Sequence, residues 1–217
     1  MVFWRDLKFC PQEGFGEECG GFWIFGEKGY NDVMKIEYKI LLIASFICNF
    51  AENLIGPFYA VFVQKIGGDI LTIGYSTTLY MIATGILIIV IGKLSDSWNK
   101  EWLTTTGYAL FAVSALGYLF ISHPWQLFIL QIIAAFGTAL LASPLTVLMA
   151  HNIDKKNEGL EWALGGGGSK IVVGLAVLVG TYLVKFFGFT TLFITIFTLD
   201  ILAMLVQLQL VINKKKL

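Results

Sequence analysis

Charged residues are scarce in this sequence. Asp, Glu, Lys and Arg make up 14% of the 217 residues, whereas hydrophobic residues make up 57%. A soluble domain averages about 25% charged and about 45–50% apolar residues, so this composition excludes an ordinary soluble globular domain. The formal net charge is zero, and no basic face is present. The sequence therefore argues against nucleic-acid binding, which depends on clustered positive charge.

Cysteine and histidine are also too few and too scattered to build a reactive centre. The three cysteines, Cys10, Cys19 and Cys48, are odd in number and widely spaced, so neither a disulfide framework nor a zinc site is indicated. The sequence offers no nucleophile–base pair, metal-ligand cluster or phosphate-binding loop. We therefore expect no metal, no cofactor and no enzymatic activity.

Long apolar runs are what the sequence has in abundance. A helix needs about 20 predominantly apolar residues to cross a bilayer. Six stretches approach or exceed this length: Ile40–Gln64, Ile73–Ile91, Leu103–Ile121, Trp125–Ala150, Trp162–Phe186 and Thr190–Ile212. Backbone groups in lipid must be satisfied within the segment, so these spans are expected to be helices. The sequence predicts an all-α integral membrane protein with six transmembrane helices in residues 34–217.

The first 33 residues differ from the rest. They are rich in glycine and aromatic residues and hold no apolar run long enough to span a bilayer. Met34 is followed at once by the first span, which favours a disordered leader or a mis-assigned start before it. The alternative is a short interfacial segment anchored by its aromatic side chains.

Lysine and arginine placement predicts the orientation. Most of these residues precede the first span, lie in the second and fourth connections, or follow the last span, whereas the other three connections offer only Lys65 and Lys185. Cytoplasmic segments carry an excess of Lys and Arg. Both termini of this multi-pass protein are therefore expected on the cytoplasmic side of the cell membrane.

A polar stripe marks one face of the first span, with Glu52 at its middle. At about 100° per residue, Ser45, Cys48, Asn49, Glu52 and Tyr59 project onto a single face. A carboxylate at mid-membrane depth costs about 2.5–3.5 kcal/mol on insertion scales, so it normally faces a bundle interior or a wet cavity. The stripe favours a cavity and a transport role.

Further polar residues are candidates for the same pathway. Gln131 and Thr138 share one face of the fourth span, and Lys170 in the fifth span either reaches the cytoplasmic surface or lines the cavity. The predicted substrate or ion pathway comprises Glu52, Asn49, Asn53, Tyr59, Gln131, Thr138 and Lys170. The alternative for Glu52 is a packing role, in which Asn49 or Asn53 holds the protonated carboxyl group.

Two other sets of residues in the fifth and sixth spans point to helix packing. Gly167 and Gly174 lie on a stripe of small residues suited to close helix contact. Asp200 lies midway along the sixth span, with Gln207 on the same face. We interpret Asp200 as a hydrogen-bonding group between packed helices.

A weak internal repeat relates the two halves of the spanning region. Residues around Pro57 can be laid over those around Pro144, an offset of 87 residues that also carries the second span onto the fifth and the third onto the sixth. Because three spans separate the copies, the repeats would be inverted. Inverted 3+3 repeats are typical of secondary transporters.

The segment between the second and third spans carries the most distinctive motif. It reads GKLSDSWNK and resembles the G-x-L-a-D-r-x-G-r-k motif of the major facilitator superfamily, with matches at Gly92, Leu94, Asp96 and Lys100. Ser97 and Asn99 stand where that family usually has Arg and Gly. We expect Gly92 to permit close helix approach and Asp96 to cap the third helix.

The resemblance covers nearly everything from Met34 onward but corresponds to one six-helix half of the usual twelve helices. It implies a transporter that moves a small solute by alternating access, with a second half supplied by a homodimer partner. A truncated or split transporter needing a different second half is one alternative. A non-transporting membrane scaffold or accessory subunit is the other.

Overall fold

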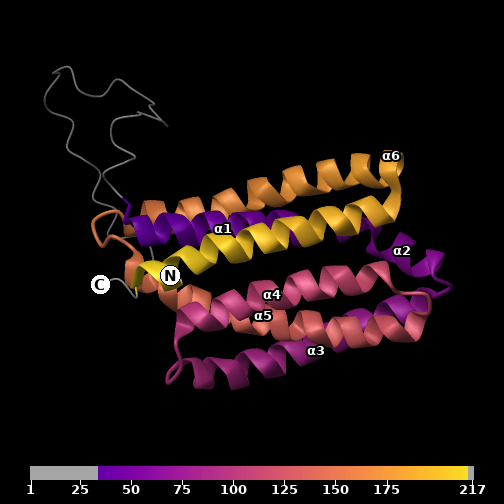
Figure 1. Cartoon of the computed structure of the whole chain (residues 1–217), viewed down its shortest axis with the longest axis horizontal. Helices are drawn as coiled ribbons and strands as arrows, with labels where there is room; N and C mark the ends of the chain where they lie inside the picture. Colours follow the sequence, from indigo (N-terminus) through magenta and orange to yellow (C-terminus); the bar gives the residue numbers. More distant parts are fainter. Residues whose placement is uncertain (1–33, 215–217) are drawn as a thin grey trace, which may run out of the picture. The chain divides into compact units, whose positions relative to one another are not determined.

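The computed structural model describes residues 34–214, with side chains up to residue 212. Predictions made for residues 1–33 lie outside this range. The described chain is built from helices: α1 (Ile36–Asn53), the 3₁₀ turn η1 (Gly56–Phe58), α2 (Tyr59–Lys65), α3 (Ile70–Ser95), α4 (Lys100–Leu119), α5 (Pro124–Asn152) and α6 (Glu158–Lys214). The chain runs back and forth along the bundle, as Figure 1 shows.

The helix labelled α6 consists of two arms that meet at Gly188. This residue has φ 80° and ψ 179°, outside the helical region. Glycine adopts a positive φ without steric cost, which explains the residue found at this corner. Figure 1 shows the first arm in orange and the second in yellow, running in opposite directions. The arms correspond to the predicted spans Trp162–Phe186 and Thr190–Ile212.

The first predicted span is not one continuous helix, which corrects the expectation for Ile40–Gln64. Helix α1 ends at Asn53, and a 3₁₀ turn containing Pro57 intervenes before α2. Proline lacks a backbone N–H and disfavours helical geometry in the residue before it. Pro144, its counterpart in the proposed repeat, instead remains inside α5. The interruption therefore begins immediately after Glu52 and Asn53.

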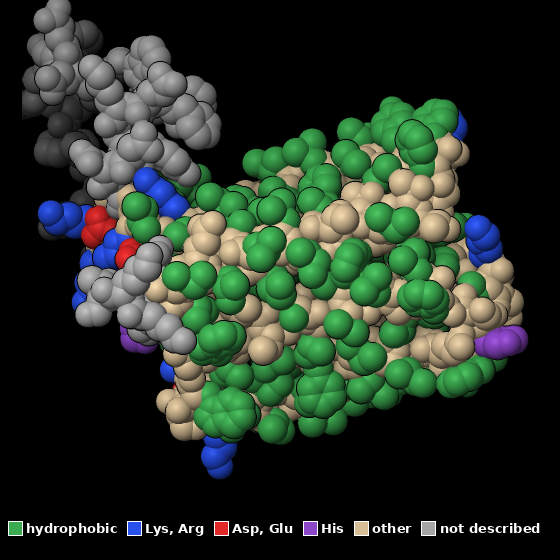
Figure 2. All heavy atoms as spheres, in the orientation of Figure 1, with side chains coloured by type: hydrophobic (Ala, Val, Ile, Leu, Met, Phe, Trp, Pro, Cys, Tyr) green, Lys and Arg blue, Asp and Glu red, His purple; other side chains and the backbone are tan. Residues whose placement is uncertain are grey.

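The outer surface of the bundle is apolar along its length. Four segments of the described chain are long and apolar enough to cross a membrane: Ile36–Lys65, Ile70–Ser95, Pro124–Asn152 and Glu158–Ile212. Helix α4 is not among them; it carries three consecutive threonines, Thr104–Thr106. Figure 2 shows green hydrophobic side chains over the middle of the bundle and lysines at its two ends. This distribution fits a multi-pass membrane protein, because lipid solvates the apolar band.

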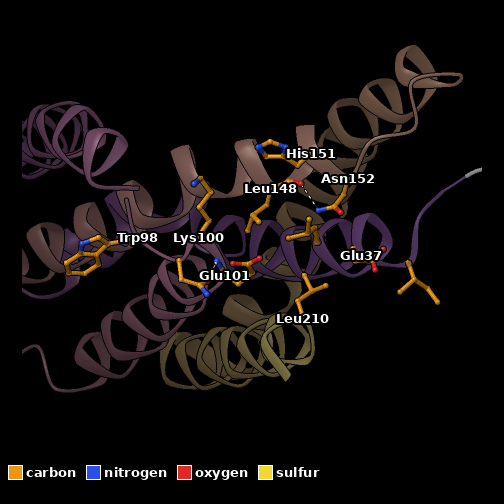
Figure 3. A pocket seen from close by; sticks show the side chains of 11 residues that line it. Glu37, Trp98, Lys100, Glu101, Leu148, His151, Asn152 and Leu210 are labelled. Carbon is orange, nitrogen blue, oxygen red and sulfur yellow. Dashed lines mark hydrogen bonds between the residues drawn. The ribbon is translucent and has the colours of Figure 1, made fainter. Parts of the chain in front are cut away.

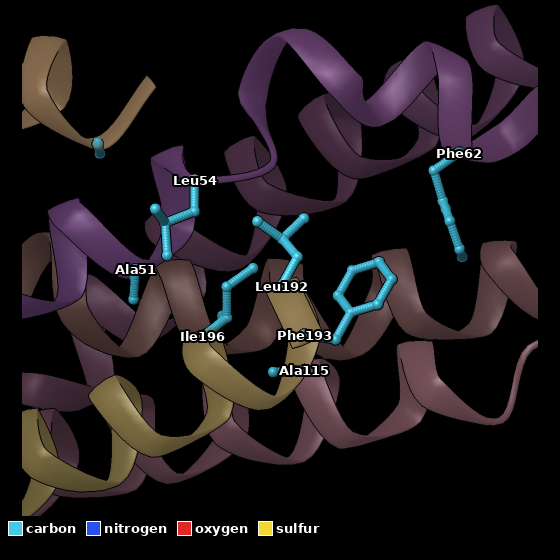
Figure 4. Close-up of a cluster of buried hydrophobic side chains, with 8 residues drawn as sticks. Ala51, Leu54, Phe62, Ala115, Leu192, Phe193 and Ile196 are labelled. Carbon is cyan, nitrogen blue, oxygen red and sulfur yellow. The ribbon is translucent and has the colours of Figure 1, made fainter. Parts of the chain in front are cut away.

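Helix α1 packs mainly against α6, α3 against α5, and α4 against both α5 and α6. One core cluster lies where the chain interruption meets the second arm of α6, as Figure 4 shows for Leu54, Phe62 and Phe193. The rings of Phe62 and Phe193 meet edge to face, with centroids 4.9 Å apart. Tyr118 of α4 stacks on Phe193 at 5.0 Å. This aromatic cluster holds the interrupted segment against the bundle.

Two polar side chains define the starts of α3 and α4. Asp69 accepts a hydrogen bond from the Thr72 backbone N–H at 2.8 Å, which caps α3. Asn99 accepts from the Glu101 and Trp102 N–H groups at 3.1 and 3.3 Å, which caps α4. The prediction that Asp96 caps this helix was wrong, because Asp96 belongs to the end of α3. Asn99 has the extended backbone that an N-cap requires.

Candidate functional site

Two adjoining cavities lie beside the weak contact between α1 and α5. The first has a volume of about 330 Å³ and the second about 470 Å³, and Glu52 and Tyr80 line both. Asn49 and Thr138 line the first cavity. Asn53, Tyr59 and Gln131 line the second. The fold therefore brings together six of the seven predicted pathway residues, drawn from α1, α2 and α5; their roles remain predictions.

A hydrogen bond crosses the first cavity from α3 to α5. The hydroxyl oxygens of Tyr80 and Thr138 lie 2.8 Å apart, and Thr138 also donates to the Ala134 carbonyl at 3.0 Å. If Thr138 donates to its own helix, Tyr80 is the donor between the two side chains. Tyr80 was not among the residues of the predicted pathway.

A second polar network joins three helices around the other cavity. The Gln131 amide donates to the Tyr59 hydroxyl at 2.6 Å, and that hydroxyl lies 2.8 Å from the Ser76 hydroxyl. Gln131 and Ser76 are buried. The network places Tyr59, just after the interruption of the first span, against both α3 and α5. Ser76 was not among the predicted site residues.

Glu52 is half-buried at the junction of the two cavities. The amides of Asn49 and Asn53 donate to the backbone carbonyls of Ser45 and Asn49, each at 2.8 Å. These amides are therefore engaged within their own helix. The group that faces the Glu52 carboxyl is instead that of Asp200, from the second arm of α6.

Asp200 was predicted to form a hydrogen bond between packed helices, and that role stays a prediction. Its side chain is completely buried, yet neither carboxyl oxygen has a hydrogen-bond partner in the described part of the chain. Gln207, two turns further on, does join the helices, because its amide donates to the Thr104 hydroxyl at 2.9 Å. Gln207, on the same face as Asp200, therefore forms a hydrogen bond between helices.

Lys170 and the small-residue stripe lie elsewhere. Lys170 is exposed on the first arm of α6 and lines neither cavity. Gly167 and Gly174 are exposed on the same arm, and a Cβ atom added at either would meet nothing within 4 Å. Within the described chain, the stripe faces no other helix and is available for an external contact.

The GKLSDSWNK motif, residues 92–100, lies at one end of the bundle. A Cβ atom on Gly92 would stand 3.4 Å from the Ser143 hydroxyl oxygen, an ordinary van der Waals contact between α3 and α5, so the close approach expected at Gly92 stays a prediction. Leu94 and Asp96 are exposed at the end of α3, and Lys100 begins α4. Lys100 also lines a separate pocket of about 520 Å³ with Glu37. Figure 3 shows this pocket, which no predicted pathway residue lines.

The polar groups of the two cavities can form hydrogen bonds with a polar ligand. These groups are hydroxyls, amides and one carboxylate, set among apolar side chains. Among the described residues, no group of three or more His, Cys, Asp or Glu could hold a metal ion. Polar cavities inside an apolar helical bundle place the protein in the class of multi-pass membrane proteins with a polar interior.

Comparison with known proteins identifies the family within this class. The sequence model of the Major Facilitator Superfamily matches residues 41–215. This match covers most of the chain, which therefore belongs to the Major Facilitator Superfamily of membrane transporters.

The relatives differ in length and in how much of them the chain covers. The chain is 25% identical over 144 residues to an uncharacterized MFS-type transporter, YitZ, of Bacillus subtilis, covering 66% of the chain and 88% of that protein. It is 24% identical over 188 residues to an uncharacterized MFS-type transporter of Methanocaldococcus jannaschii, covering 84% of the chain and 49% of the relative. It is 25% identical to the proton-coupled antiporter flippase LtaA of Staphylococcus epidermidis, covering 69% of the chain and 37% of that protein. The chain thus spans half or less of the two longer relatives.

Proposed function

We propose that this protein is a secondary transporter that moves a small polar solute by alternating access. The observation that carries the proposal is the position of Glu52, an acidic side chain at the junction of two polar cavities in the middle of an apolar bundle. Such a residue marks a substrate or ion pathway more often than a packing contact. Membership of the Major Facilitator Superfamily supports a transport role.

The proposed membrane arrangement has six spans with both termini in the cytoplasm. Helix α4 has 20 residues, about 30 Å at 1.5 Å per residue, which matches the hydrocarbon core of a bilayer. Counting α4 and the two arms of α6 as spans gives six. Lys93 and Lys100 then lie on the cytoplasmic side, in keeping with the lysine asymmetry. An inverted 3+3 repeat accounts for this even number of spans.

A second half is needed to close the pathway, and we propose that a second copy of the chain supplies it. The face available for this contact includes α3, of whose apolar window only 11% is buried, and the Gly167–Gly174 stripe of α6. Small residues let helix backbones approach closely in membranes. Two-fold symmetry about the membrane normal would bring two copies of each cavity together.

Cysteine accessibility tests whether the cavities form a pathway. In a background with the three native cysteines replaced by serine, Asn49→Cys and Thr138→Cys should react with a membrane-impermeant maleimide in reconstituted vesicles. Ile89→Cys is the control, because Ile89 is 76% exposed on the apolar surface of α3 and lines neither cavity. Failure of both cavity positions to react, with the folded protein intact, would contradict the pathway.

The coupling role of Glu52 is tested by Glu52→Gln in vesicles that contain a pH-sensitive dye. A panel of organic cations and neutral polar solutes is added outside, and solute-dependent proton movement is recorded. The change keeps the shape and hydrogen-bonding capacity of the side chain but removes its titration. Solute-dependent proton flux should be lost, while the variant remains folded. Unchanged flux across pH would exclude Glu52 from coupling. The name of the flippase relative supports testing protons first.

The homodimer is tested by measuring the mass of the detergent-solubilised protein by light scattering. Gly174→Leu should shift the population toward monomer, because the added side chain separates the helices. Gly166→Leu is the matched control, since Gly166 is equally open but lies off the stripe. If the unaltered protein is monomeric, the second half must be a different chain.

A further inference from the structure

The carboxyl group of Asp200 has no donor when it is ionised. The side chain is fully buried between α6 and its neighbours, and both carboxyl oxygens lack a hydrogen-bond partner among the described residues. An uncompensated buried charge is costly, and such groups are normally paired or neutralised. The environment of Asp200 must therefore supply either a cation or a proton.

The groups around Asp200 supply no positive charge. Glu52 of α1 faces it within hydrogen-bonding reach, Cys48 lies one turn earlier on α1, and Tyr108 approaches from α4. Tyr118 of α4 lines the second cavity together with Glu52. None of these side chains is cationic. The Tyr108 hydroxyl is itself buried and lacks a hydrogen-bond partner in the described structure.

A single proton resolves this arrangement. Two ionised carboxylates in contact repel each other, and neither can donate a hydrogen bond to the other. When one carboxyl group is protonated, it becomes the donor and its neighbour the acceptor. One of the two orphaned oxygens of Asp200 then gains a hydrogen-bond partner in Glu52.

We propose that Glu52 and Asp200 share one proton, with Asp200 as its buried holder behind the solute cavity. Asp200 lines neither cavity, whereas Glu52 lines both. Glu52 is thus the route by which the shared proton exchanges with cavity water. The inference assigns a proton-binding role to a residue of the second arm of α6, and it holds whether or not the protein transports a solute.

Infrared difference spectroscopy of the purified full-length protein in lipid nanodiscs tests the shared proton. The wild type should show the carbonyl stretch of a protonated carboxyl group at neutral pH, with the isotope shift expected in D₂O. Asp200→Asn should lose this band, because the new amide donates to Glu52 and leaves it ionised beside cavity water. Asp69→Asn, which changes an exposed acid at a helix start, should keep the band.

Either of two results would overturn the proposal: no band in the wild type, or an unchanged band in Asp200→Asn. If Asp200→Asn does not fold, Glu52→Gln provides the test. If the two carboxyl groups share a proton, the carbonyl band must shift or disappear when Glu52 becomes an amide. The spectrum is recorded without solute. If maleimide does not reach the cavities but the carbonyl band is present as expected, the transport proposal is refuted and the shared proton is not.

Discussion

Replacing Gly180 with alanine should destabilise the protein, although alanine is the better helix former. Gly180 lies on the first arm of α6, where it is buried against the chain interruption that follows α1. A Cβ atom added there would collide with the carbonyl oxygen of Leu54 and stand 3.0 Å and 3.1 Å from its carbonyl carbon and Cα. These are backbone atoms, so no side-chain rotation can relieve the contact.

The magnitude follows from two opposing terms. Glycine to alanine in a helix interior gains about 0.8–1.0 kcal/mol of intrinsic propensity. Overpacking a well-packed interior typically costs about 1–3 kcal/mol, and a backbone neighbour places Gly180 toward the upper end. We therefore expect a net loss of about 1–2 kcal/mol, together with displacement of the segment next to Glu52.

Gly166→Ala provides the matched control on the same arm. A Cβ atom at Gly166 would meet nothing within 4 Å, so only the favourable propensity term applies. Equilibrium unfolding by SDS in detergent micelles, followed by tryptophan fluorescence, measures both variants against the wild type. The two free energies of unfolding should differ by about 2 kcal/mol or more. If Gly180→Ala is as stable as Gly166→Ala, the close approach of α6 to Leu54 is wrong.

Three further predictions concern the ends of the helices. In a cysteine-free background, a cysteine at Ser122 should be labelled from outside the cell and one at Ser97 should not; the reverse pattern would invert the proposed topology. Hydrogen bonds from the first turn of α3 lower the pKa of Asp69, so the folded state favours its ionised form. Its contribution to stability is then present at neutral pH and lost as the pH falls below about 4, and Asp69→Asn should flatten this loss in thermal unfolding curves. Asn99→Ala should cost about 1 kcal/mol of unfolding free energy through the lost cap, whereas Asp96→Ala should cost less; equal losses would contradict the assigned cap.

The helical layout could be predicted from the sequence because apolar length is a local property. The interruption after Asn53 was also visible in principle, since Gly56 and Pro57 break helices, but the surrounding apolar residues favoured a single span. The α4 cap was misassigned because Asp96 and Asn99 are both good capping residues. Only the backbone path separates them.

The content of the candidate site was harder to predict. Projecting the first span as a helix placed Asn49 and Glu52 on one face. In the structure both residues line the first cavity from α1. The contact between Glu52 and Asp200 depends on how the second arm of α6 returns to α1, and no periodicity encodes that path. Lys170 was predicted to belong to the pathway because of its charge. In the structure it lies on an exposed face of α6 and lines neither cavity.

The connection between the two arms of α6 at Gly188 is very short. A single residue of non-helical geometry joins them, whereas the α5–α6 connection spans residues 153–157. The first arm carries the exposed glycines Gly167 and Gly174, and the second arm carries Asp200. If a partner binds the first arm and shifts it, no flexible loop lies between the two arms to absorb the movement. We expect such a shift to move the second arm as well, and with it the buried Asp200 side chain.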